Sequence, residues 1–490
     1  AFLGYSGSSD FLEAVVKTRK NVLKIFHSIL GIKDEKSRPA KIPEFNFDNK
    51  LRAEKDLLFL REGKGLLGQK EFDKSTTESF RNIEGNLFKY FKKSANPDLV
   101  LQNFVRIIKS DDFPSIWYSA FTDEKFFKSF LNVCEYSQRS VDLFAEDKEL
   151  KEFFLTKRVF EKIDAPGIIK WGTKKVLFLL SVQHILKLLA APKLSELLSR
   201  YFSARINNIS VQEFKKEPGN YFIAGMGSFG SEEMIFASDI DLIFSVKGLE
   251  RKSYLQKDFQ NLLLKFKEIF KPFDADCRLR PEGKSSLLAW DLESYKNYIK
   301  TRARIWELQS LCKINFVSGN EKMFGSFADA VVKRIESEDK EKIKSEIKEM
   351  RKKLYSQRLG VLNSQRRILD LKKAPGGLAD IDFLLQFLTL ADPGIFEKLR
   401  GKGTLKSISL LERQGKHASL DRLKSNFLFF KELQAANQNI FNATSSILPN
   451  DEKKNRIIAQ WMGFHSQEDL HHEISKALKS NLTVFDQYFR

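Results

Sequence analysis

Residues 221–246, YFIAGMGSFGSEEMIFASDIDLIFSV, constrain the fold of this chain more than any other stretch. The short apolar run at 221–224 predicts a strand, and the three glycines after it permit a tight turn and a close approach of backbone to a ligand. A second strand is expected at 238–244, and it begins with two acidic residues, Asp239 and Asp241. Side chains alternate along a strand, so these two carboxylates project from the same face.

Two carboxylates held so close repel each other unless a cation lies between them. Hard oxygen ligands at this spacing suit Mg²⁺, which commonly arrives with substrate phosphates, and a glycine turn offers backbone N–H groups to those phosphates. Gly227-Ser228, followed after ten residues by Asp239-Ile-Asp241, has the pattern of the nucleotidyltransferase superfamily. The stretch therefore predicts a metal-dependent nucleotidyl transfer site in which Gly227 and Ser228 bind phosphate. An acidic strand start after an ordinary loop is the alternative.

The length of 490 residues leaves room for two or three domains. No run of about 18 apolar residues appears, so no membrane span is expected. Three widely spaced cysteines without metal-ligand spacing suit a reducing, cytoplasmic setting. A net charge of +19 fits a polyanionic ligand such as ATP or nucleic acid, but the lysines are mixed with glutamates on helical-looking segments. Solvated helix faces explain that charge better, and nucleic acid is not the expected partner.

The pattern along the chain predicts an α+β protein that is mostly helical. Its centre is a nucleotidyltransferase (polymerase-β-like) domain with a mixed sheet, flanked by helical domains or bundles. The expected organisation is a helical end of a preceding unit at 1–30, a linker or irregular segment at 31–76, a helical domain at 77–200, the nucleotidyltransferase domain at 201–320 and a C-terminal helical bundle domain at 321–490.

The resemblance to the nucleotidyltransferase superfamily implies a third carboxylate on a neighbouring strand, and the segment FDADCRLRPEG at 273–283 supplies it. In an extended conformation Asp276, Arg278 and Arg280 share one face with Asp274. Asp276 is the candidate third carboxylate and metal ligand, whereas Asp274 fits a solvated residue at the start of a strand. The two arginines are expected to offset triphosphate charge, with structural pairing to the acidic cluster as the alternative.

Four motifs together resemble the glutamine synthetase adenylyltransferase family. They are Gly225-Met-Gly227 with Asp239-Ile-Asp241, Asp276-Cys-Arg278-Leu-Arg280-Pro281-x-Gly283, Trp306-Glu307-x-Gln309, and Gly376-Gly377-Leu-Ala-Asp380-Ile-Asp382. The resemblance implies transfer of AMP from ATP to a tyrosine of glutamine synthetase, with two Mg²⁺ ions held by Asp239, Asp241 and Asp276. It also implies control by a PII-type signal protein and by glutamine.

The resemblance adds further candidates. Lys313 keeps one of two basic residues that the family places after Gln309 and is a candidate triphosphate contact. Glu307, Gly376, Gly377, Asp380 and Asp382 are weaker candidates. The alternative is a core tryptophan at 306 whose neighbour Glu307 has a satisfied partner, and a helix-start turn whose acidic residues favour the helix dipole. Lys372 either approaches phosphate or is a solvated lysine.

Details such as Ser285-Ser-Leu-Leu288 and Gln309 resemble the C-terminal, adenylylating half of that bifunctional family. Residues 3–26 also align without a gap on 462–485, which suggests a duplicated protein of which this chain is the C-terminal portion. Two similar amphipathic helices explain the same match.

Three other functions are left open by the sequence. The same family also removes AMP by phosphorolysis in its N-terminal half. A tRNA-terminal or poly(A) nucleotidyltransferase shares the acidic residues, as does a uridylyltransferase, although six scattered histidines give no sign of the hydrolase domain found in that family. A non-catalytic ATP-binding regulatory module is disfavoured by the intact acidic residues.

Overall fold

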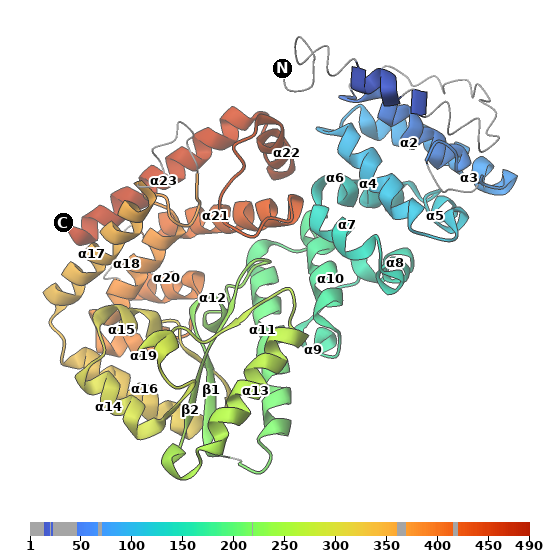
Figure 1. Cartoon of the computed structure of the whole chain (residues 1–490). Coiled ribbons are helices and arrows are strands. Elements are labelled where there is room, and N and C mark those ends of the chain that lie inside the picture. The colour runs from blue at the N-terminus through green and yellow to red at the C-terminus, as the bar shows by residue number, and fades with distance from the viewer. Residues whose placement is uncertain are drawn as a thin grey trace.

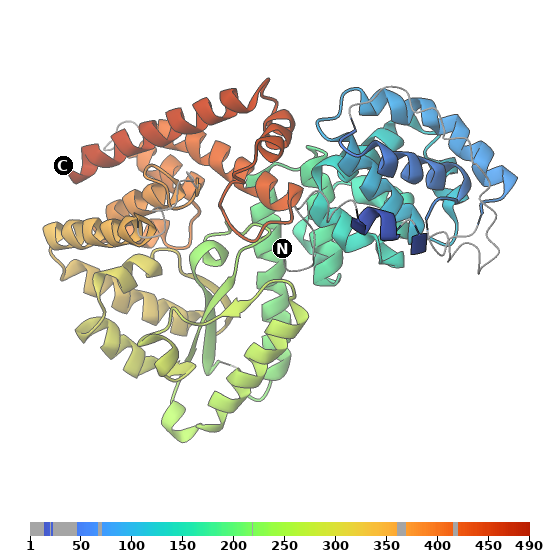
Figure 2. The same cartoon turned by 45° about the horizontal axis from the view of Figure 1, so that its top comes forward.

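The structure, a computed structural model, describes residues 14–19, 21–22, 47–66, 71–217, 219–359, 369–414 and 420–490. In Figures 1 and 2 the N-terminal helices form one body, which lies beside a central region containing the sheet, and the C-terminal helices pack against both. Within the helical end predicted at 1–30, residues 14–19 and 21–22 are helical. The rest of that prediction, and most of the aligned segment 3–26, lie outside the described residues.

Short helices joined by tight turns build the N-terminal body. They are α2 (Lys50–Glu62), α3 (Lys74–Phe91), α4 (Pro97–Lys109), α5 (Pro114–Ala120), α6 (Glu124–Tyr136), α7 (Gln138–Phe144), α8 (Lys148–Leu155), η1 (Arg158–Phe160), α9 (Ala165–Ile168) and α10 (Thr173–Ile185). Side chains of Asn or Asp at several of their N-caps accept backbone N–H groups, for example Asn96 from Leu99 and Asp147 from Leu150. The prediction of a linker or irregular segment at 31–76 is therefore wrong for the part that forms the helix α2.

Aromatic side chains fill the core of this body. The ring centroids of Phe104 and Phe130 lie 5.1 Å apart in an edge-to-face arrangement, and those of Phe121 and Phe130 lie 4.5 Å apart. Trp117 is fully buried among them, and its indole N–H donates to Asp111. Such ring pairs stabilise a fold beyond the area that they bury, so the abundant phenylalanines of the sequence act as core residues here.

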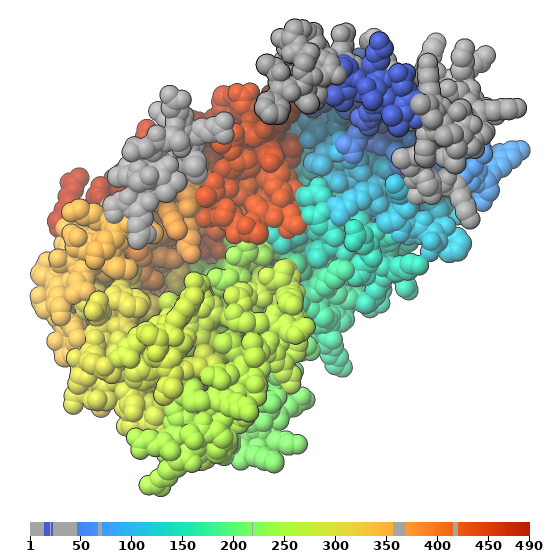
Figure 3. Space-filling view, viewed as in Figure 1, coloured from blue at the N-terminus to red at the C-terminus, as the bar shows by residue number. Residues whose placement is uncertain are grey.

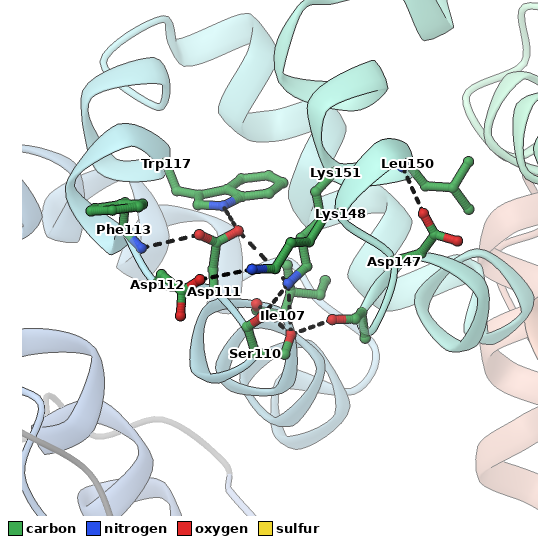
Figure 4. Close-up of polar contacts among 11 residues, drawn as sticks. Ile107, Ser110, Asp111, Asp112, Phe113, Trp117, Asp147, Lys148, Leu150 and Lys151 are labelled. Carbon is green, nitrogen blue, oxygen red and sulfur yellow. Dashed lines mark hydrogen bonds and ion pairs between the residues drawn. The ribbon is translucent and has the colours of Figure 1, made fainter.

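A buried lysine fastens two of these helices together (Figure 4). Lys151 of α8 donates to the carbonyl oxygen of Ser110 at 2.5 Å and to its hydroxyl at 3.0 Å, at the C-terminal end of α4. The Asp111 carboxylate lies 3.7 Å from the ammonium. A cation at the carboxyl end of a helix satisfies carbonyl groups that have no partner inside the helix, so Lys151 has a structural role.

The central region carries the sheet. Its elements are α11 (Ala191–Glu213), β1 (Tyr221–Gly225), α12 (Gly227–Gly230), β2 (Ile240–Val246), η2 (Leu249–Arg251), α13 (Tyr254–Ile269), β3 (Ala275–Asp276), η3 (Gly283–Ser285), β4 (Ala289–Asp291), α14 (Leu292–Thr301), α15 (Ile305–Leu311) and β5 (Asn315–Gly319). The strand order is β3-β2-β1-β5, and β4 also pairs with β2. β1 runs antiparallel to β2 and β5, whereas β3 and β4 run parallel to β2, so the sheet is mixed.

The sheet separates two hydrophobic cores, and the alternation of side chains explains this division. Tyr221 and Ile223 of β1 join the core of the N-terminal body, α11 and α13. Phe222 and Ala224 point to the other face and join the core of the C-terminal helices. With both faces covered, β1 and β2 are apolar almost throughout, as a strand buried on both faces should be.

The remaining helices are α16 (Glu321–Glu336), α17 (Lys340–Leu359), α18 (Leu378–Leu390), α19 (Pro393–Leu399), α20 (Thr404–Arg413), α21 (Leu420–Ile440), α22 (Glu452–Met462) and α23 (Gln467–Phe489). The prediction of a mostly helical α+β protein is thus confirmed. Within the described part of the chain, no helix has the length and apolar character needed to cross a bilayer.

Buried polar contacts join the C-terminal helices to the N-terminal body, whose surfaces adjoin in Figure 3. Arg139 of α7 donates to the carbonyl oxygens of Gln438 and Ala443. His184 of α10 lies 3.1 Å from the carboxylate of Glu432, and the amide of Asn439 donates to the carbonyl of Ser181 at 2.8 Å. These bonds place α21 between the N-terminal body and the sheet.

Candidate active site

The glycine turn and β2 are adjacent because β1 and β2 pair directly. Gly225 faces Leu242 in the antiparallel register, and the N–H of Met226 donates to the carbonyl of Asp241 at 2.9 Å. Gly227 follows with φ of +54°, and a Cβ at this position would lie 2.5 Å from a carboxylate oxygen of Asp241. Glycine is therefore required both by the backbone conformation and by the nearby carboxylate.

Asp239 and Asp241 form an acidic pair in which the pKa values of both carboxyl groups are raised. Burial raises the pKa of Asp241 to about 7, and the nearby charges of Asp276 and Asp239 contribute. The pKa of Asp239 is also raised, by burial and by Asp276 and Asp274. Burial is the largest cause of both shifts, and the positive charges of Arg278 and Lys372 offset them only in part. The pair is therefore a place where a bound cation would restore ionisation near neutral pH.

Asp276 lies beside this pair, but its carboxylate is already engaged. Parallel pairing sets Asp276 opposite Asp241 in the register of β2 and β3. Its two oxygens accept from the backbone N–H of Arg278 at 2.8 Å and from the Arg278 guanidinium. The guanidinium also lies 3.9 Å from Asp239. Arg278 thus pairs with the acidic cluster, as the alternative interpretation of this residue expected.

The carboxylate chemistry of Asp239 and Asp241 fits a hard divalent cation such as Mg²⁺. Among the described residues, no three His, Cys, Asp or Glu side chains are arranged so that they alone would hold a metal ion. Backbone, water and phosphate oxygens complete many Mg²⁺ sites, so the pair itself is compatible with the ion.

The segment 274–280 is not the extended strand that the sequence pattern suggested. β3 contains only Ala275 and Asp276, and the chain then turns. Arg280 donates to the carbonyl oxygens of Cys277, Lys284 and Ser286. Its guanidinium therefore folds the 277–286 loop, and it does not line the cavity described next, which corrects its predicted position facing a triphosphate.

A cavity of 540 Å³ opens beside the acidic pair. Its lining includes Gly227, Ser228, Asp239 and Asp241 from the predicted site, and also Lys313, Lys372 and Asp382. Residues of the C-terminal helices complete its wall. One cavity therefore brings together the glycine turn and two of the three predicted metal ligands, Asp239 and Asp241. It also brings in three of the candidates suggested by the family resemblance, which are Lys313, Lys372 and Asp382.

Lys313 lies between two carboxylates in this wall. Its ammonium is 2.7 Å from Asp382 and 3.3 Å from Glu233. These two anions raise the pKa of Lys313 against the opposing effect of burial, so the side chain is charged. Asp382 consequently serves as its counterion at the edge of the cavity.

The structural alternative for Trp306 and Glu307 holds for the glutamate and fails for the tryptophan. Trp306 is 38% exposed, so it is not a core residue. Glu307 is buried and accepts from the Tyr298 hydroxyl at 2.8 Å and from the Arg304 N–H at 2.9 Å. Its carboxylate caps α15 and does not line the cavity, which agrees with the structural alternative for this residue.

Asp380 organises the glycine turn before α18. Its carboxylate accepts two bonds from the Arg351 guanidinium, at 2.8 and 2.7 Å, and one from the Gly376 N–H at 2.7 Å. Gly376 has φ of +79°, and a Cβ there would collide with the backbone of Leu478 in α23. A Cβ at Gly377 would lie 2.6 Å from the carbonyl of Leu371. These three residues support the fold of the turn.

The same turn holds Lys372 at the cavity. The Asp370 carboxylate accepts the backbone N–H groups of Lys372 and Lys373, at 2.9 and 3.1 Å. Leu371 donates to the carbonyl of Ser446 at 3.1 Å, which fixes this segment against the end of the α21–α22 connection. The charge of Lys372 lowers the pKa values of Asp239 and Asp241 in part, so this exposed lysine lies near the acidic pair.

Several cavity residues were not anticipated from the sequence. They are Glu233, Lys373, Gln386, Lys431, Gln434 and Gln438. A signal for three of them existed, since Lys431, Gln434 and Gln438 recur at helical spacing within a segment that otherwise reads as an apolar stripe. Buried polar side chains at such positions require partners, which a sequence pattern alone does not supply.

Two family models match adjoining parts of the chain. Residues 107–330 match the model described as glutamate-ammonia ligase adenylyltransferase. This range includes the glycine turn, the acidic pair, Asp276 and Lys313. Residues 341–489 match the model described as GlnD PII-uridylyltransferase. That range contains most of the C-terminal helices but none of the three predicted metal ligands, Asp239, Asp241 and Asp276.

Curated relatives agree with the first match. A bifunctional glutamine synthetase adenylyltransferase/adenylyl-removing enzyme from Thioalkalivibrio sulfidiphilus is 31% identical over 192 residues, which is 36% of this chain and 19% of that protein. The enzyme of the same description from Rhizobium meliloti is 30% identical over 238 residues, or 44% of this chain and 23% of that protein. The one from Nitrosomonas eutropha is 27% identical over 267 residues, or 51% of this chain and 28% of that protein.

The matched regions thus span between about a fifth and about a quarter of the length of these relatives. The segment matched by the first family model is the one in which β1, the glycine turn and β2 create the acidic pair. The matching model, the relatives and this arrangement agree that residues 107–330 of the chain are similar to the glutamate-ammonia ligase adenylyltransferase family.

Proposed function

We propose that this chain transfers AMP from ATP to a tyrosine of glutamine synthetase and releases pyrophosphate. The observation that supports it best is the acidic pair Asp239 and Asp241, set against Gly227 at the mouth of a cavity with several lysines. A nucleoside triphosphate combines the two properties that this arrangement favours, because it carries several negative charges and brings a divalent cation.

In this proposal, different residues of the site bind the phosphates and the metal ions. The turn at Gly227 and Ser228 accommodates phosphates against backbone N–H groups. Lys313 and Lys372 place positive charge around the cavity. Asp239 and Asp241, with Asp276 once it leaves Arg278, would hold two Mg²⁺ ions. When bound, such ions neutralise charge on the triphosphate and increase the nucleophilicity of an attacking oxygen.

We propose further that the activity is that of the adenylylating half of the relatives, as the motifs around Pro281 and Gln309 suggest. Positioning and charge neutralisation would supply most of the acceleration, because the attacking phenol needs only to be held in line with the α-phosphorus. Among nucleotidyl acceptors, a protein side chain fits better than RNA. Many lysines and arginines of the chain form ion pairs with carboxylates, as in Lys252–Glu217 and Lys175–Glu149.

We also propose regulation by a PII-type signal protein and by glutamine. The similarity of residues 341–489 to a family described as a PII-uridylyltransferase supports a link to PII signalling. Cytoplasmic location is part of this proposal. The three cysteines, Cys134, Cys277 and Cys312, are buried and unpaired, which suits a reducing compartment.

The test is the intact mass of purified glutamine synthetase after incubation with this chain, ATP and Mg²⁺. We expect the mass of one AMP to be added per subunit by the wild type and by Asp274→Asn, and no addition by Asp241→Asn. Asp274 is a matched control because it is exposed and pairs with Lys267 at 2.8 Å at the same strand end.

Other outcomes would redirect the assignment. Phosphate-dependent loss of AMP from modified glutamine synthetase, without any addition, would identify the phosphorolytic activity. Salt-sensitive RNA binding with nucleotide addition to RNA would favour a nucleic-acid nucleotidyltransferase. Nucleotide binding without transfer to either substrate would favour a non-catalytic regulatory module.

A further inference from the structure

Helix α21 presents a polar stripe to the cavity. Phe427, Lys431, Gln434 and Gln438 all line it, at intervals of four, three and four residues. This spacing places them on one side of a helix. Lys431, Gln434 and Gln438 are each at least 90% buried. Burying such side chains is costly unless they bind something, so the stripe needs an explanation.

Part of the stripe joins α21 to the segment that leads into the acidic pair. The side-chain oxygen of Gln438 accepts the Ala237 N–H at 3.0 Å. The Lys431 ammonium donates to the carbonyl oxygen of Glu233 at 2.8 Å. Residues 233–237 directly precede Asp239, so α21 and the acidic pair are held in a fixed relation.

The charge of Lys431 is not explained by an ion pair with Glu233. The Glu233 carboxylate is taken by other donors, which are the Lys313 ammonium at 3.3 Å, the Thr404 N–H at 2.6 Å and the Ser231 hydroxyl at 3.1 Å. Lys431 bonds only the neutral backbone carbonyl of that residue in the described part of the chain. An ammonium has three N–H donors, and the Glu233 carbonyl accepts one from Lys431. Two N–H groups of Lys431 are therefore left for other acceptors.

The contrast with Lys313 defines what Lys431 lacks. Lys313 is held by two carboxylates, whereas Lys431 has no carboxylate within ion-pair distance in the described structure. Burial lowers the pKa of Lys431 to about 8, and the nearby charges of Lys313 and Lys372 act in the same direction. Glu233 and Asp382 partly oppose this shift. A ligand anion would supply the missing counter-charge.

We propose that Lys431 binds the phosphate chain of the nucleoside triphosphate in the cavity that it lines together with the glycine turn and the acidic pair. The inference rests on the proposed function only in that the ligand is a nucleoside triphosphate. In this arrangement α21 supplies a phosphate ligand from outside the sheet domain. Lys431 is thus a substrate-binding residue, additional to those predicted from the sequence.

The test is direct titration of the protein with an ATP analogue that carries a methylene group between the α- and β-phosphates, in Mg²⁺ and without glutamine synthetase. We expect Lys431→Met to raise the Kd of the analogue by about 10- to 100-fold, the range of a lost hydrogen bond to a charged group. The same variant should change the Kd of AMP less than threefold, because AMP lacks the β- and γ-phosphates.

Two further variants separate binding from folding. Lys431→Arg keeps the charge and should recover most of the affinity for the analogue. Lys424→Met removes an exposed lysine from the same helix and should bind like the wild type. Melting temperature and circular dichroism report whether Lys431→Met retains the fold.

An unchanged Kd for the analogue in Lys431→Met would overturn the inference, as would equal losses for the analogue and AMP. Failure of Lys431→Arg to recover affinity would also count against it. These results are independent of the transfer reaction. A wild type that binds the analogue through Lys431 but adds no AMP to glutamine synthetase would refute only the proposed function.

Discussion

The acidic pair should reduce the stability of the metal-free protein, and Asp241→Asn should relieve that effect. Asn has the shape of Asp but no charge, and it replaces the carboxyl whose pKa is raised from 3.8 to about 7 in the folded protein. A raised carboxyl pKa means that the ionised group destabilises the folded state. The shift of about three units corresponds to at most about 4 kcal/mol.

The sign of the pH dependence follows from the same linkage. Above pH 7 the folded protein carries the ionised carboxylate at its full cost, so Asp241→Asn should show its largest gain at pH 8. The gain should shrink as pH falls through 7 and vanish below about 4, where Asp241 is protonated in both the folded and unfolded states.

Urea denaturation in EDTA, followed by tryptophan fluorescence, measures this effect at pH 5 and pH 8. Asp274→Asn is the matched control, because its exposed carboxylate pairs with Lys267; it should show a much smaller gain, since its charge is only a minor cause of the raised pKa of Asp239. Saturating Mg²⁺ should stabilise the wild type at pH 8 and leave Asp241→Asn nearly unchanged, since only the wild type retains both carboxylates of the pair.

Equal stability of Asp241→Asn and the wild type at pH 8 in EDTA would refute the reasoning. So would a gain that is as large at pH 5 as at pH 8, because the destabilisation would then not come from ionisation.

Three other predictions follow from the same site. Gly227→Ala should lower AMP transfer by at least about 100-fold, the scale of a 1 Å misplacement, because its Cβ would lie against Asp241; a turnover assay with circular dichroism as the folding control checks this. Asp380→Asn should cost about 3–5 kcal/mol in urea denaturation, since it leaves the Arg351 guanidinium without its buried partner, and a loss below 1 kcal/mol would contradict that role. Trp306→Ala should change stability by less than about 0.5 kcal/mol because the side chain is exposed, and a large loss on thermal melting would argue that the indole is a core residue.

Much of the site could be predicted because it is local in sequence. Asp239 and Asp241 lie two residues apart on one strand, and Gly227 is joined to them by a single strand–turn–strand unit. Strand alternation and glycine geometry are short-range properties. The mixed sheet and the flanking helices were likewise visible as changes in hydrophobic period along the chain.

The segment around Asp276 shows where this reasoning stops. Alternation along 274–280 suggested a continuous strand, but pairing with β2 ends after Asp276. The loop then closes through bonds from Arg280 to three carbonyl groups. Strand length depends on hydrogen-bonded neighbours, which a single segment does not specify.

The sequence by itself determined the acidic pair, the glycine turn and the resemblance to a known family. Only the tertiary structure decided which distant residues surround them. Lys431 and Glu233 are 198 positions apart and meet in one bond, and Arg351 and Asp380 do so across 29 positions. Helix packing on a sheet follows from the burial of whole faces, so the polar groups that it brings together are fixed by the assembled core, and local sequence pattern contains no record of them.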